Sequence, residues 1–501
     1  MTATRSIAEL PGPRGLPLIG NAHRLRPAEM HLVAERWCER YGPVFRFDLG
    51  RRHFVVIADV DAINAILRDR PDGFRRWREV LINAKDLTGT YGVFHAEGED
   101  WRRQRRLAVT ALNSNHLQRY FDVVRTCTGR LLERLQPAAS DGRVLDIDRE
   151  LCSFTVDVTS ALAFGHDLNT LERGESELQK HIQRIFYIGG RRLVIPIPYW
   201  RYFKLPVDRA ADRSWVAIDS AVGAFIQEAR DRIAATPQLR EAPENLLESM
   251  IAAQENDGAF TDEEIVGNVF TLLFAGEDTT AHTMAWTLWF LAREPEVQKR
   301  WAAEAEEVLG EERFPGGYDM VGELRYGEAV LRESMRLKPV APILGVEPLA
   351  DTTLADTLIP AGTRLVLLTR LAGLRAVNRA EVFDPDRWLE DERDGQNGSA
   401  PDQKSFLGFG AGPRFCPGRN LAFLESKAAL AMIARNFQIE LDESAGPVSE
   451  LLAFTMIPKG LRVRLRERAA GGPVGVGAAE RLMATGAAER GNGSLSAGTG
   501  A

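Results

Sequence analysis

Most of the chain has apolar residues every three to four positions, which is the period of an amphipathic helix. This period predicts helices over 61–69, 97–113, 116–136, 145–166, 174–190, 209–236 and 260–293, with another beginning near Asn420. Alternation of apolar and polar residues predicts two strands within 41–58 joined at Gly50, and short strands and turns that complete one small sheet at 339–346, 351–369 and 451–465. The expected fold class is mainly α with a small β region.

The segments between these elements suggest how the chain is organised. Residues 71–96 and 194–206 show no period and are rich in Gly, Pro or aromatic residues, so both are predicted to be irregular loops. After about residue 467 the composition is dominated by Gly, Ala, Ser and Glu, which is typical of disorder. The expected organisation is a proline-rich lead (1–20), a single large domain (21–466, β-rich mainly at 41–70 and 339–385) and a disordered tail (467–501).

The longest helical pattern, 260–293, has small and polar residues at its centre. Thr261 and Glu264 form a capping box at its start. The sequence AGEDTT at 275–280 interrupts a bulky apolar run. Small residues there would let a flat ligand lie against the backbone, and the Thr279 hydroxyl can donate to the carbonyl four residues earlier. A simple packing notch is the alternative interpretation.

Composition and charge exclude several classes of function. The 501 residues include 63 Lys and Arg against 70 Asp and Glu, a net charge of −7, which argues against a general nucleic-acid-binding protein. The four cysteines have no paired spacing, so a disulfide framework is not expected. Neither a signal peptide nor an apolar span of about 20 residues is found, and we expect a cytoplasmic protein without a membrane anchor.

One cysteine, Cys416, lies in a Gly- and Pro-rich loop ahead of a helical pattern, in the sequence FLGFGAGPRFCPGRNLAF at 406–423. Glycines allow positive φ and a close approach of the backbone to a flat ligand. Backbone amides and a helix N-terminus favour the thiolate, so Cys416 is a candidate metal ligand. Zinc is disfavoured because no further Cys or His lies nearby in sequence. A buried, inert cysteine is the bland alternative.

The spacing of Phe409, Gly412, Arg414, Cys416 and Gly418 resembles the haem loop of the cytochrome P450 family, in the form FGxGxRxCPGRNLA found in eukaryotic members. The resemblance implies a triangular prism of helices around haem b, iron protoporphyrin IX. It implies Cys416 as the iron ligand, with Phe409, Arg414 and Gly418 in the cofactor site. Without an anchor before its proline-rich lead, the chain looks like a soluble, bacterial-type member.

A second motif matches the family at the cofactor's carboxylate groups. Trp101 and Arg105 match a WxxxR pair that contacts a haem propionate, although an ordinary Arg-rich surface helix is the alternative. Many members also place a basic residue near position 346, where this chain has Val346. The resemblance therefore implies that Arg414, Arg105 and Arg375 supply that charge.

The AGEDTT segment matches the oxygen-binding segment of the family, with Ala275 and Gly276 in the cofactor site. The resemblance makes Asp278 and Thr279 an acid–alcohol pair that delivers protons. The neighbouring Glu277 is a second candidate for this relay.

Glu333 and Arg336 match the ExxR motif of the family, and Arg387 matches the arginine that completes its triad. ExxR alone is a weak signal because such pairs are common on helices. The implied role is structural: the charge network holds the loop that carries the thiolate, and leaving a buried charge unpaired is costly.

The resemblance implies a monooxygenase that inserts one atom of O2 into its substrate by hydroxylation or epoxidation. In the family, residues 71–96 cover the pocket and 194–206 form its roof. The expected lining is mostly apolar, which favours a lipophilic substrate: Phe94, Phe270, Ala275, Ile343, Leu344, Phe454 and Met456.

The chain leaves no room for a flavin domain, so the resemblance implies a separate electron donor, a ferredoxin or flavodoxin with its reductase. Arg102, Arg103 and Arg106 could steer such an acidic partner, or form an ordinary solvated face. Two other classes of function stay open: a peroxide-driven or isomerising haem-thiolate enzyme, and a haem-based sensor. Asp278 and Thr279 argue against the sensor.

Overall fold

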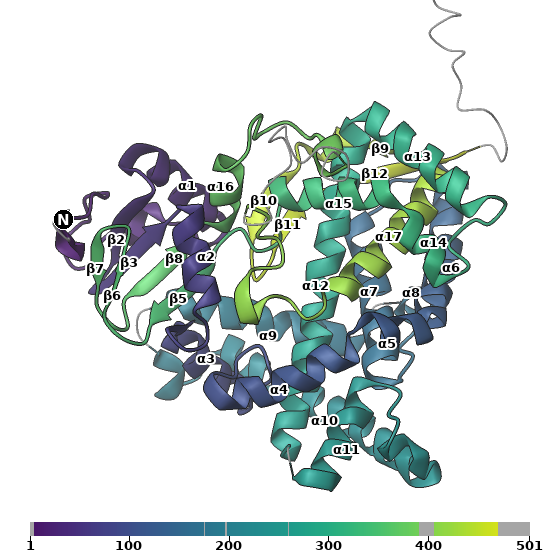
Figure 1. Ribbon diagram of the computed structural model, residues 1–501, viewed down its shortest axis with the longest axis horizontal. Coiled ribbons are helices and arrows are strands. Elements are labelled where there is room, and N and C mark those ends of the chain that lie inside the picture. The colour runs from purple at the N-terminus through teal and green to yellow at the C-terminus, as the bar shows by residue number, and fades with distance from the viewer. Residues whose placement is uncertain (1–4, 175, 196–197, 259, 390–404, 469–501) are drawn as a thin grey trace, which may run out of the picture.

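The computed structural model describes residues 5–174, 176–195, 198–258, 260–389 and 405–468. A β-rich part that includes the N-terminus lies at one end, and helices make up the rest (Figure 1). The prediction of a mainly α protein with a small β region is confirmed. The long helix α12 (Asp262–Arg293) runs through the helical part, and the helices packed against it include α7 (Ile147–Phe164), α15 (Arg325–Leu337) and α17 (Arg419–Asn436).

The largest sheet has five strands in the order β2–β3–β8–β5–β4. The hairpin predicted within 41–58 is present, and Gly50 in its turn has a φ of +60°. Alternate residues of β3 enter different cores: Val55 packs on one face of the sheet and Val56 on the other. The strands are β2 (Val44–Leu49), β3 (Arg52–Ile57), β4 (Phe74–Arg76), β5 (Leu344–Pro348) and β8 (Arg364–Leu367).

Residues 71–96 are not the irregular loop that was predicted. They contain strand β4 and helix α3 (Arg78–Thr88), which ends at Gly89 in the left-handed region. Helix α3 packs against α9 (Glu177–Val194), where the Asn83 amide donates to the Gly189 carbonyl at 2.8 Å. A three-residue strand is too short to show a period, and α3 depends on α9 for its buried face.

Residues 451–465 do not complete the five-stranded sheet, and this prediction was also wrong. They contribute to two separate antiparallel pairs, β10 (Ser449–Leu452) with β11 (Met456–Lys459), and β12 (Val463–Glu467) with β9 (Phe437–Leu441). A fourth sheet, of three strands, joins β6 (Thr352–Leu354) and β7 (Thr357–Ile359) to β1 (Arg5–Ser6). Residues of the proline-rich lead therefore pair with the main body of the protein. The predicted tail lies outside the described residues from 469 onward.

The other predicted helices are present with shifted bounds, and the structure adds helices for which no prediction was made. The helix predicted at 116–136 is divided at Tyr120 into α5 (Ser114–Arg119) and α6 (Phe121–Ser140). None of the described helices is long and apolar enough to cross a membrane. The others are α1 (Met30–Tyr41), α2 (Val60–Arg68), α4 (Gly98–Ala111), α8 (Thr170–Arg173), α10 (Pro206–Ala235), α11 (Leu246–Asp257), α13 (Pro295–Leu309), α14 (Tyr318–Glu323) and α16 (Thr369–Arg375).

Helix α12 connects two separate hydrophobic cores. Its first half, including Val269 and Leu273, packs with α9, α10 and α11. Its second half, including Met284 and Leu288, packs with α6, α7 and α17. The segment 275–280 lies at the junction of the two cores, so its polar groups lie where neither core is continuous.

Candidate functional site

Side-chain hydroxyl groups bond the backbone carbonyl groups of the 275–280 segment. Thr279 Oγ1 donates to the Ala275 carbonyl oxygen at 2.6 Å, as expected, and Thr155 of α7 donates to the Glu277 carbonyl oxygen at 3.0 Å. Because Thr279 has given its only proton to Ala275, its oxygen is left to accept hydrogen bonds from a ligand or water.

Gly276 lies against α7, which differs from the expected position beside a flat ligand. A Cβ at this position would lie 2.2 Å from Oγ1 and 2.8 Å from Cγ2 of Thr159. The glycine therefore allows α7 and α12 to approach closely.

Two carboxyl groups beside Thr279 are shifted toward their protonated forms. Burial first, and then the neighbouring Asp278, raise the pKa of Glu277 to about 8, although the Gln179 amide donates to its Oε1 at 3.2 Å and opposes the shift. Burial also raises the pKa of Asp278, and His282 opposes this. Such shifts are typical of groups that exchange protons.

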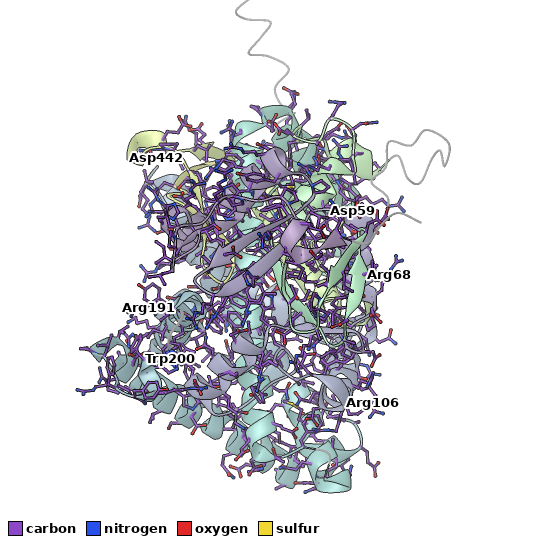
Figure 2. All side chains as sticks on the ribbon, turned by 90° about the vertical axis from the view of Figure 1, so that its left-hand side faces the viewer. Asp59, Arg68, Arg106, Arg191, Trp200 and Asp442 are labelled. Carbon is purple, nitrogen blue, oxygen red and sulfur yellow. The ribbon has the colours of Figure 1, made fainter. Side chains whose placement is uncertain are left out.

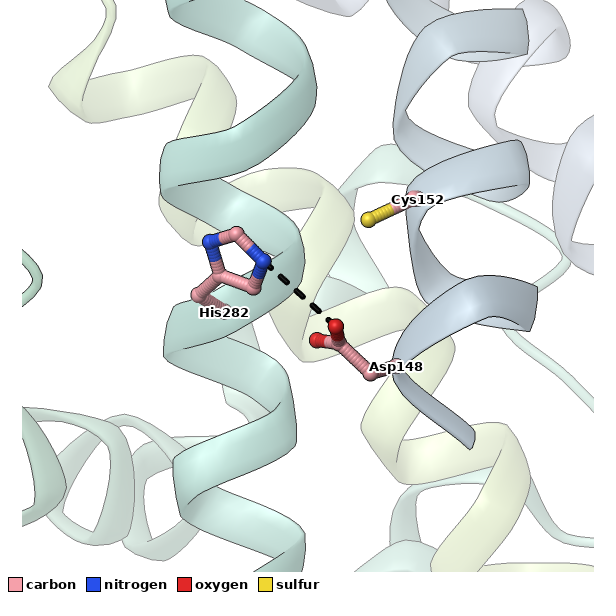
Figure 3. A group of neighbouring side chains, drawn as sticks. All are labelled: Asp148, Cys152 and His282. Atoms are coloured by element: carbon pink, nitrogen blue, oxygen red, sulfur yellow. Dashed lines mark ion pairs between the residues drawn. The ribbon is translucent and has the colours of Figure 1, made fainter. Parts of the chain in front are cut away.

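His282, one turn beyond Asp278 on α12, belongs to a polar group with Asp148 and Cys152 of α7 (Figure 3). Its Nε2 lies 3.5 Å from Asp148 Oδ2, and its Nδ1 lies 2.8 Å from Thr455 Oγ1. Burial disfavours the imidazolium, but Asp148 and the other nearby carboxylates outweigh it, and the pKa of His282 is raised. Among the described residues this group offers three ligand atoms, one fewer than a structural zinc site needs. The group is better explained as an ion pair beside Asp278.

The loop before Cys416 is closed on itself and packs directly on α2. The Cys416 amide donates to the Phe409 carbonyl oxygen at 2.9 Å. Gly410 and Gly412 have φ values of +73° and +69°, in the left-handed region. A Cβ at Gly412 would lie 2.3 Å from the Leu67 carbonyl oxygen, so only glycine fits there.

The charge environment of Cys416 meets the expectation of a favoured thiolate only in part. Burial raises the pKa of its thiol, whereas the Gly418 amide and the Arg105 guanidinium act in the opposite direction. A positive charge at the sulfur would be needed to outweigh burial, and a bound metal ion supplies one.

The predicted pair Trp101 and Arg105 brings helix α4 onto the cysteine loop. Arg105 Nη2 donates to the Phe415 carbonyl oxygen at 2.6 Å. Arg414 forms an ion pair with Glu97, and its guanidinium carbon lies 5.0 Å from the centre of a Trp101 ring. The structure thus brings three of the predicted cofactor residues, Trp101, Arg105 and Arg414, together at the Cys416 loop.

Arg375 does not join this group, and that expectation was wrong. Its Nη1 donates to Cys38 Sγ of α1 at 3.1 Å, so its guanidinium is directed to the N-terminal helix. Val346 is fully buried among the apolar residues of the five-stranded sheet.

Glu333, Arg336 and Arg387 form the predicted triad, and all three are buried. Arg336 binds both oxygens of Glu333, with Nε and Nη2 at 2.8 and 2.7 Å, and Arg387 Nε donates to Glu333 Oε1 at 2.9 Å. The Asp384 amide and the Trp388 indole also donate to Glu333, each at 2.9 Å. One carboxylate on α15 therefore holds the segment 384–388.

Aromatic contacts connect this triad to the cysteine loop. The Trp388 ring lies edge-on to Phe406 at 5.2 Å between centres, and Phe406 lies edge-on to Phe409 at 6.3 Å. The carbonyl of Phe409 accepts from the Cys416 amide. Direct contacts through Trp388, Phe406 and Phe409 therefore connect Glu333 to Cys416.

A hydrogen bond also joins the two main motifs. Thr280, the last residue of AGEDTT, bonds the side chain of Glu425 on α17, the helix that begins three residues after Cys416. Glu425 is buried, its Oε2 has no partner among the described residues, and burial raises its pKa well above the usual value.

Three of the expected pocket residues are joined by aromatic contacts. Phe94 and Phe454 lie edge-on at 5.8 Å, and Phe270 stacks on Phe186 at 5.6 Å. Phe186 of α9 and Phe274 of α12 complete the cluster, since both contact Phe454. The sequence analysis missed these two residues, although Phe274 directly precedes AGEDTT and Phe186 lies in a predicted amphipathic helix.

The other expected lining residues lie elsewhere. Met456 is fully buried, and its sulfur accepts from Arg370 Nη1 at 3.4 Å, within an ion-pair network with Glu35 and Glu450. Ile343 and Leu344 pack against the two cores of the five-stranded sheet. The expectation that these three line the pocket finds no support in their contacts.

Comparison with known proteins identifies the family. The statistical description of the family named Cytochrome P450 matches residues 10–465. The chain is 26% identical over 445 residues to protein LUTEIN DEFICIENT 5, chloroplastic, of Arabidopsis thaliana, covering 85% of this chain and 72% of that protein.

Two further relatives come from other organisms. Cytochrome P450 97B2, chloroplastic, of Glycine max is 26% identical over 86% of this chain and 82% of its own length. The Caenorhabditis elegans protein CYP13A3 is 25% identical over 91% of this chain and 93% of its own length. These plant and nematode relatives leave the expected bacterial type untested. The match over nearly the whole chain, together with the cysteine loop and the buried triad, shows that this protein belongs to the cytochrome P450 family.

Proposed function

We propose that this cytochrome P450 monooxygenase inserts one atom of O2 into a lipophilic substrate, by hydroxylation or epoxidation, with electrons from a separate redox partner. The family itself implies haem-thiolate monooxygenase chemistry. The substrate class, the partner and the roles of individual residues are the proposed part. The observation that carries the proposal is the closed, glycine-dependent loop of Cys416, whose following helix is hydrogen-bonded to the AGEDTT segment through Glu425 and Thr280.

Cys416 is the proposed iron ligand. It is the one cysteine of the four that lies in a loop, since Cys38, Cys127 and Cys152 lie within helices α1, α6 and α7. Trp101, Arg105 and Arg414 would hold the cofactor at this loop, because Arg105 and Arg414 bring positive charge to it.

The residues present fit an anionic cofactor. Arg70 is 4% exposed, and its Nε and Nη2 have no hydrogen-bond partner among the described residues. A buried guanidinium without partners is costly, so the site is complete only when an anion lies there. The carboxylates of haem b satisfy that requirement.

When bound, haem held by the Cys416 thiolate would supply the activation of O2 and the oxidation of the substrate. The chain supplies the protons and their order of delivery. The Thr279 oxygen accepts a hydrogen bond and so orients a water, while Asp278 passes protons toward it. Asp148, which is partly exposed, connects His282 and hence this turn of α12 with solvent.

A lipophilic substrate is supported by the aromatic cluster on the first half of α12. Phe274 and Phe454 lie 4.1 Å apart between ring centres, and Phe94 extends the cluster toward the cysteine-loop side through Arg76. The apolar rings of this cluster would provide most of the surface for such a substrate.

A separate electron donor is supported by exposed cations on one side of the molecule. Of the three arginines expected to steer it, Arg102 pairs with Asp72 and Arg103 with Glu264, which neutralises much of their charge. Arg106 is exposed, and Figure 2 shows it on the same edge as Arg68 at the end of α2. We propose these two as contacts for an acidic ferredoxin or flavodoxin.

The test is the absorption band of the reduced protein with carbon monoxide. Cys416→Ala should abolish the red-shifted thiolate band, and Cys416→His should move it to the position of imidazole-ligated haem. Cys152→Ala and Cys127→Ala are the matched controls and should keep the band. A thiolate band that persists in Cys416→Ala contradicts the proposal.

The reaction is tested separately. Turnover with NADPH, ferredoxin and its reductase should exceed turnover with peroxide alone, and lipophilic compounds should produce a low-spin to high-spin shift. Faster turnover with peroxide alone would favour a peroxide-driven enzyme.

A further inference from the structure

Arg76 lies directly across the sheet from Val346, the position near which many members of the family have a basic residue. Strand β4 pairs antiparallel with β5, and their register places Arg76 opposite Val346. Residues opposite each other in an antiparallel pair project from the same face, with their Cβ atoms about 5 Å apart. The Arg76 side chain therefore projects from the same face of the sheet as the side chain of residue 346. The two side chains begin one strand spacing apart.

Arg76 is directed toward the region of the cysteine loop. Its Nε donates to the Phe94 carbonyl oxygen at 2.9 Å, and its guanidinium carbon lies 3.9 Å from the centre of the Phe94 ring. Its backbone amide donates to Glu97, the carboxylate that also pairs with Arg414. The neighbouring Arg75 projects from the opposite face, where it binds Glu347 at 2.7 Å.

The charges around Arg76 do not balance within the protein. Arg70 and Arg414 both act on Arg76 with like charge, and Glu97 is the one carboxylate that acts in the opposite sense. Burial and Arg414 lower the pKa of Arg70 to about 10, and burial lowers that of Arg76 as well. His95 adds no charge, because burial first and these arginines next lower its pKa to about 3.

Three guanidinium groups and one carboxylate leave two positive charges without a partner. Haem b carries two propionate carboxylates, which is the number that this group lacks. A metal ion would add to the imbalance, a neutral ligand would leave it unchanged, and a single carboxylate would leave half of it.

We propose that Arg76 takes over from the opposite strand the role of the absent basic residue at 346, and that Arg76 and the unpartnered Arg70 bind the haem propionates together with Arg414. This rests on the haem site proposed above. Arg70 and Arg76 are thus positioning residues for the cofactor, and the segment 70–76 becomes part of the cofactor site.

The test measures how fast the ferric holoprotein loses haem to an excess of apomyoglobin. Loss of a hydrogen bond to a charged group costs about 1.5–3 kcal/mol, so Arg76→Met and Arg70→Met should each lose haem roughly 10- to 100-fold faster than the parent. Arg75→Met is the matched control and should change the rate by about fivefold at most, because an ion pair on the far face contributes about 0–1 kcal/mol.

A second readout is the ferric–ferrous midpoint potential. Positive charge beside the propionates favours the reduced haem, so Arg76→Met and Arg70→Met should lower the potential and Arg75→Met should not. The double variant Arg76→Val, Val346→Arg places the positive charge at position 346. It should restore the midpoint potential and slow haem loss relative to Arg76→Val alone.

Haem loss at the parent's rate in Arg76→Met and Arg70→Met would overturn the proposal, as would equal acceleration in Arg75→Met. If Arg76→Met gives no folded holoprotein, Arg76→Lys takes its place, because lysine keeps the charge without the planar guanidinium. Haem loss from Arg76→Lys should then be faster than haem loss from Arg75→Met. Failure of the haem-thiolate site would instead appear as a missing thiolate band in the parent protein. The two proposals can therefore fail separately.

Discussion

The Thr279 hydroxyl can act only as an acceptor toward a ligand, because its proton is donated to the Ala275 carbonyl oxygen at 2.6 Å. Its partner Asp278 is shifted toward the protonated form by burial, with His282 one turn away opposing the shift. An acceptor beside a proton-holding acid orients a water molecule between them, which suits stepwise delivery of protons.

Replacing Thr279 should separate electron consumption from product formation. Thr279→Ala removes the acceptor oxygen but no residue that holds the cofactor, so NADPH consumption should continue while product falls and peroxide rises. Thr283→Ala is the matched control, because its hydroxyl makes the same bond to the carbonyl four residues earlier, at 2.8 Å, one turn further on. The measurement is product formed per NADPH consumed, and parental values in Thr279→Ala would contradict the role.

Glu277 should make the stability of the protein depend on pH. Burial raises its pKa from 4.5 to about 8, so between these values the folded state holds a proton that the unfolded state has released. Stability should therefore fall as pH rises through this window, by up to about 1.4 kcal/mol per pH unit. Glu277→Gln should flatten this slope in urea unfolding of the holoprotein at pH 5 to 8. An unchanged slope would show that Glu277 is not the group responsible.

At the scale of elements, one carboxylate on α15 organises the segment that supports the cysteine loop. Glu333 accepts from two arginines, an indole and a backbone amide, and it is fully buried. Trp388, one of these donors, packs against Phe406, which in turn packs against Phe409. The network thus acts on the haem site through packing, at a distance from the chemistry.

Glu333→Ala should yield apoprotein or insoluble material, because two buried arginines lose their counter-charge at a cost of about 3–5 kcal/mol. Glu255→Ala is the control, because its ion pair with Arg240 is exposed on both sides and should contribute about 0–1 kcal/mol. The measurements are haem content per protein and the urea midpoint. Intact Glu333→Ala holoprotein with altered product selectivity would contradict a structural role.

At the scale of the whole molecule, the β-rich end and the helical part both contribute residues to the proposed cofactor site. The segment 70–76 follows α2 of the β-rich part, whereas α12 and α17 belong to the helical part (Figure 1). Exposed Arg68 and Arg106 lie on one edge (Figure 2), although the whole chain has a net charge of −7. Under the proposal above, these two arginines would orient an acidic partner on a protein that is acidic as a whole.

Charge reversal on this edge should slow reduction by an acidic partner. Arg106→Glu should raise the KM for ferredoxin roughly three- to tenfold, with kcat unchanged, and should reduce the dependence of the rate on ionic strength. Arg125→Glu, an exposed arginine of α6, is the matched control and should leave both unchanged. Equal effects in the two variants would indicate a general charge effect and no docking edge.

The sequence by itself determined what depends on neighbours close along the chain. The capping box of α12, the Thr279 bond to Ala275, the β2–β3 hairpin and the ExxR pair follow from hydrogen bonds and turns within a few residues. The glycine pattern around Cys416 likewise predicts its loop, because positive φ is a local property. The family resemblance then connected these local features to one chemistry.

Only the tertiary structure decided which distant groups meet. It placed Gly276 against Thr159, directed Arg375 to Cys38, and formed β4 and α3 where no period was visible. It also set Arg76 opposite Val346. The physical reason is that the environment of a side chain is made by strands and helices hundreds of residues away, and sheet register and helix packing, not local sequence, bring them together.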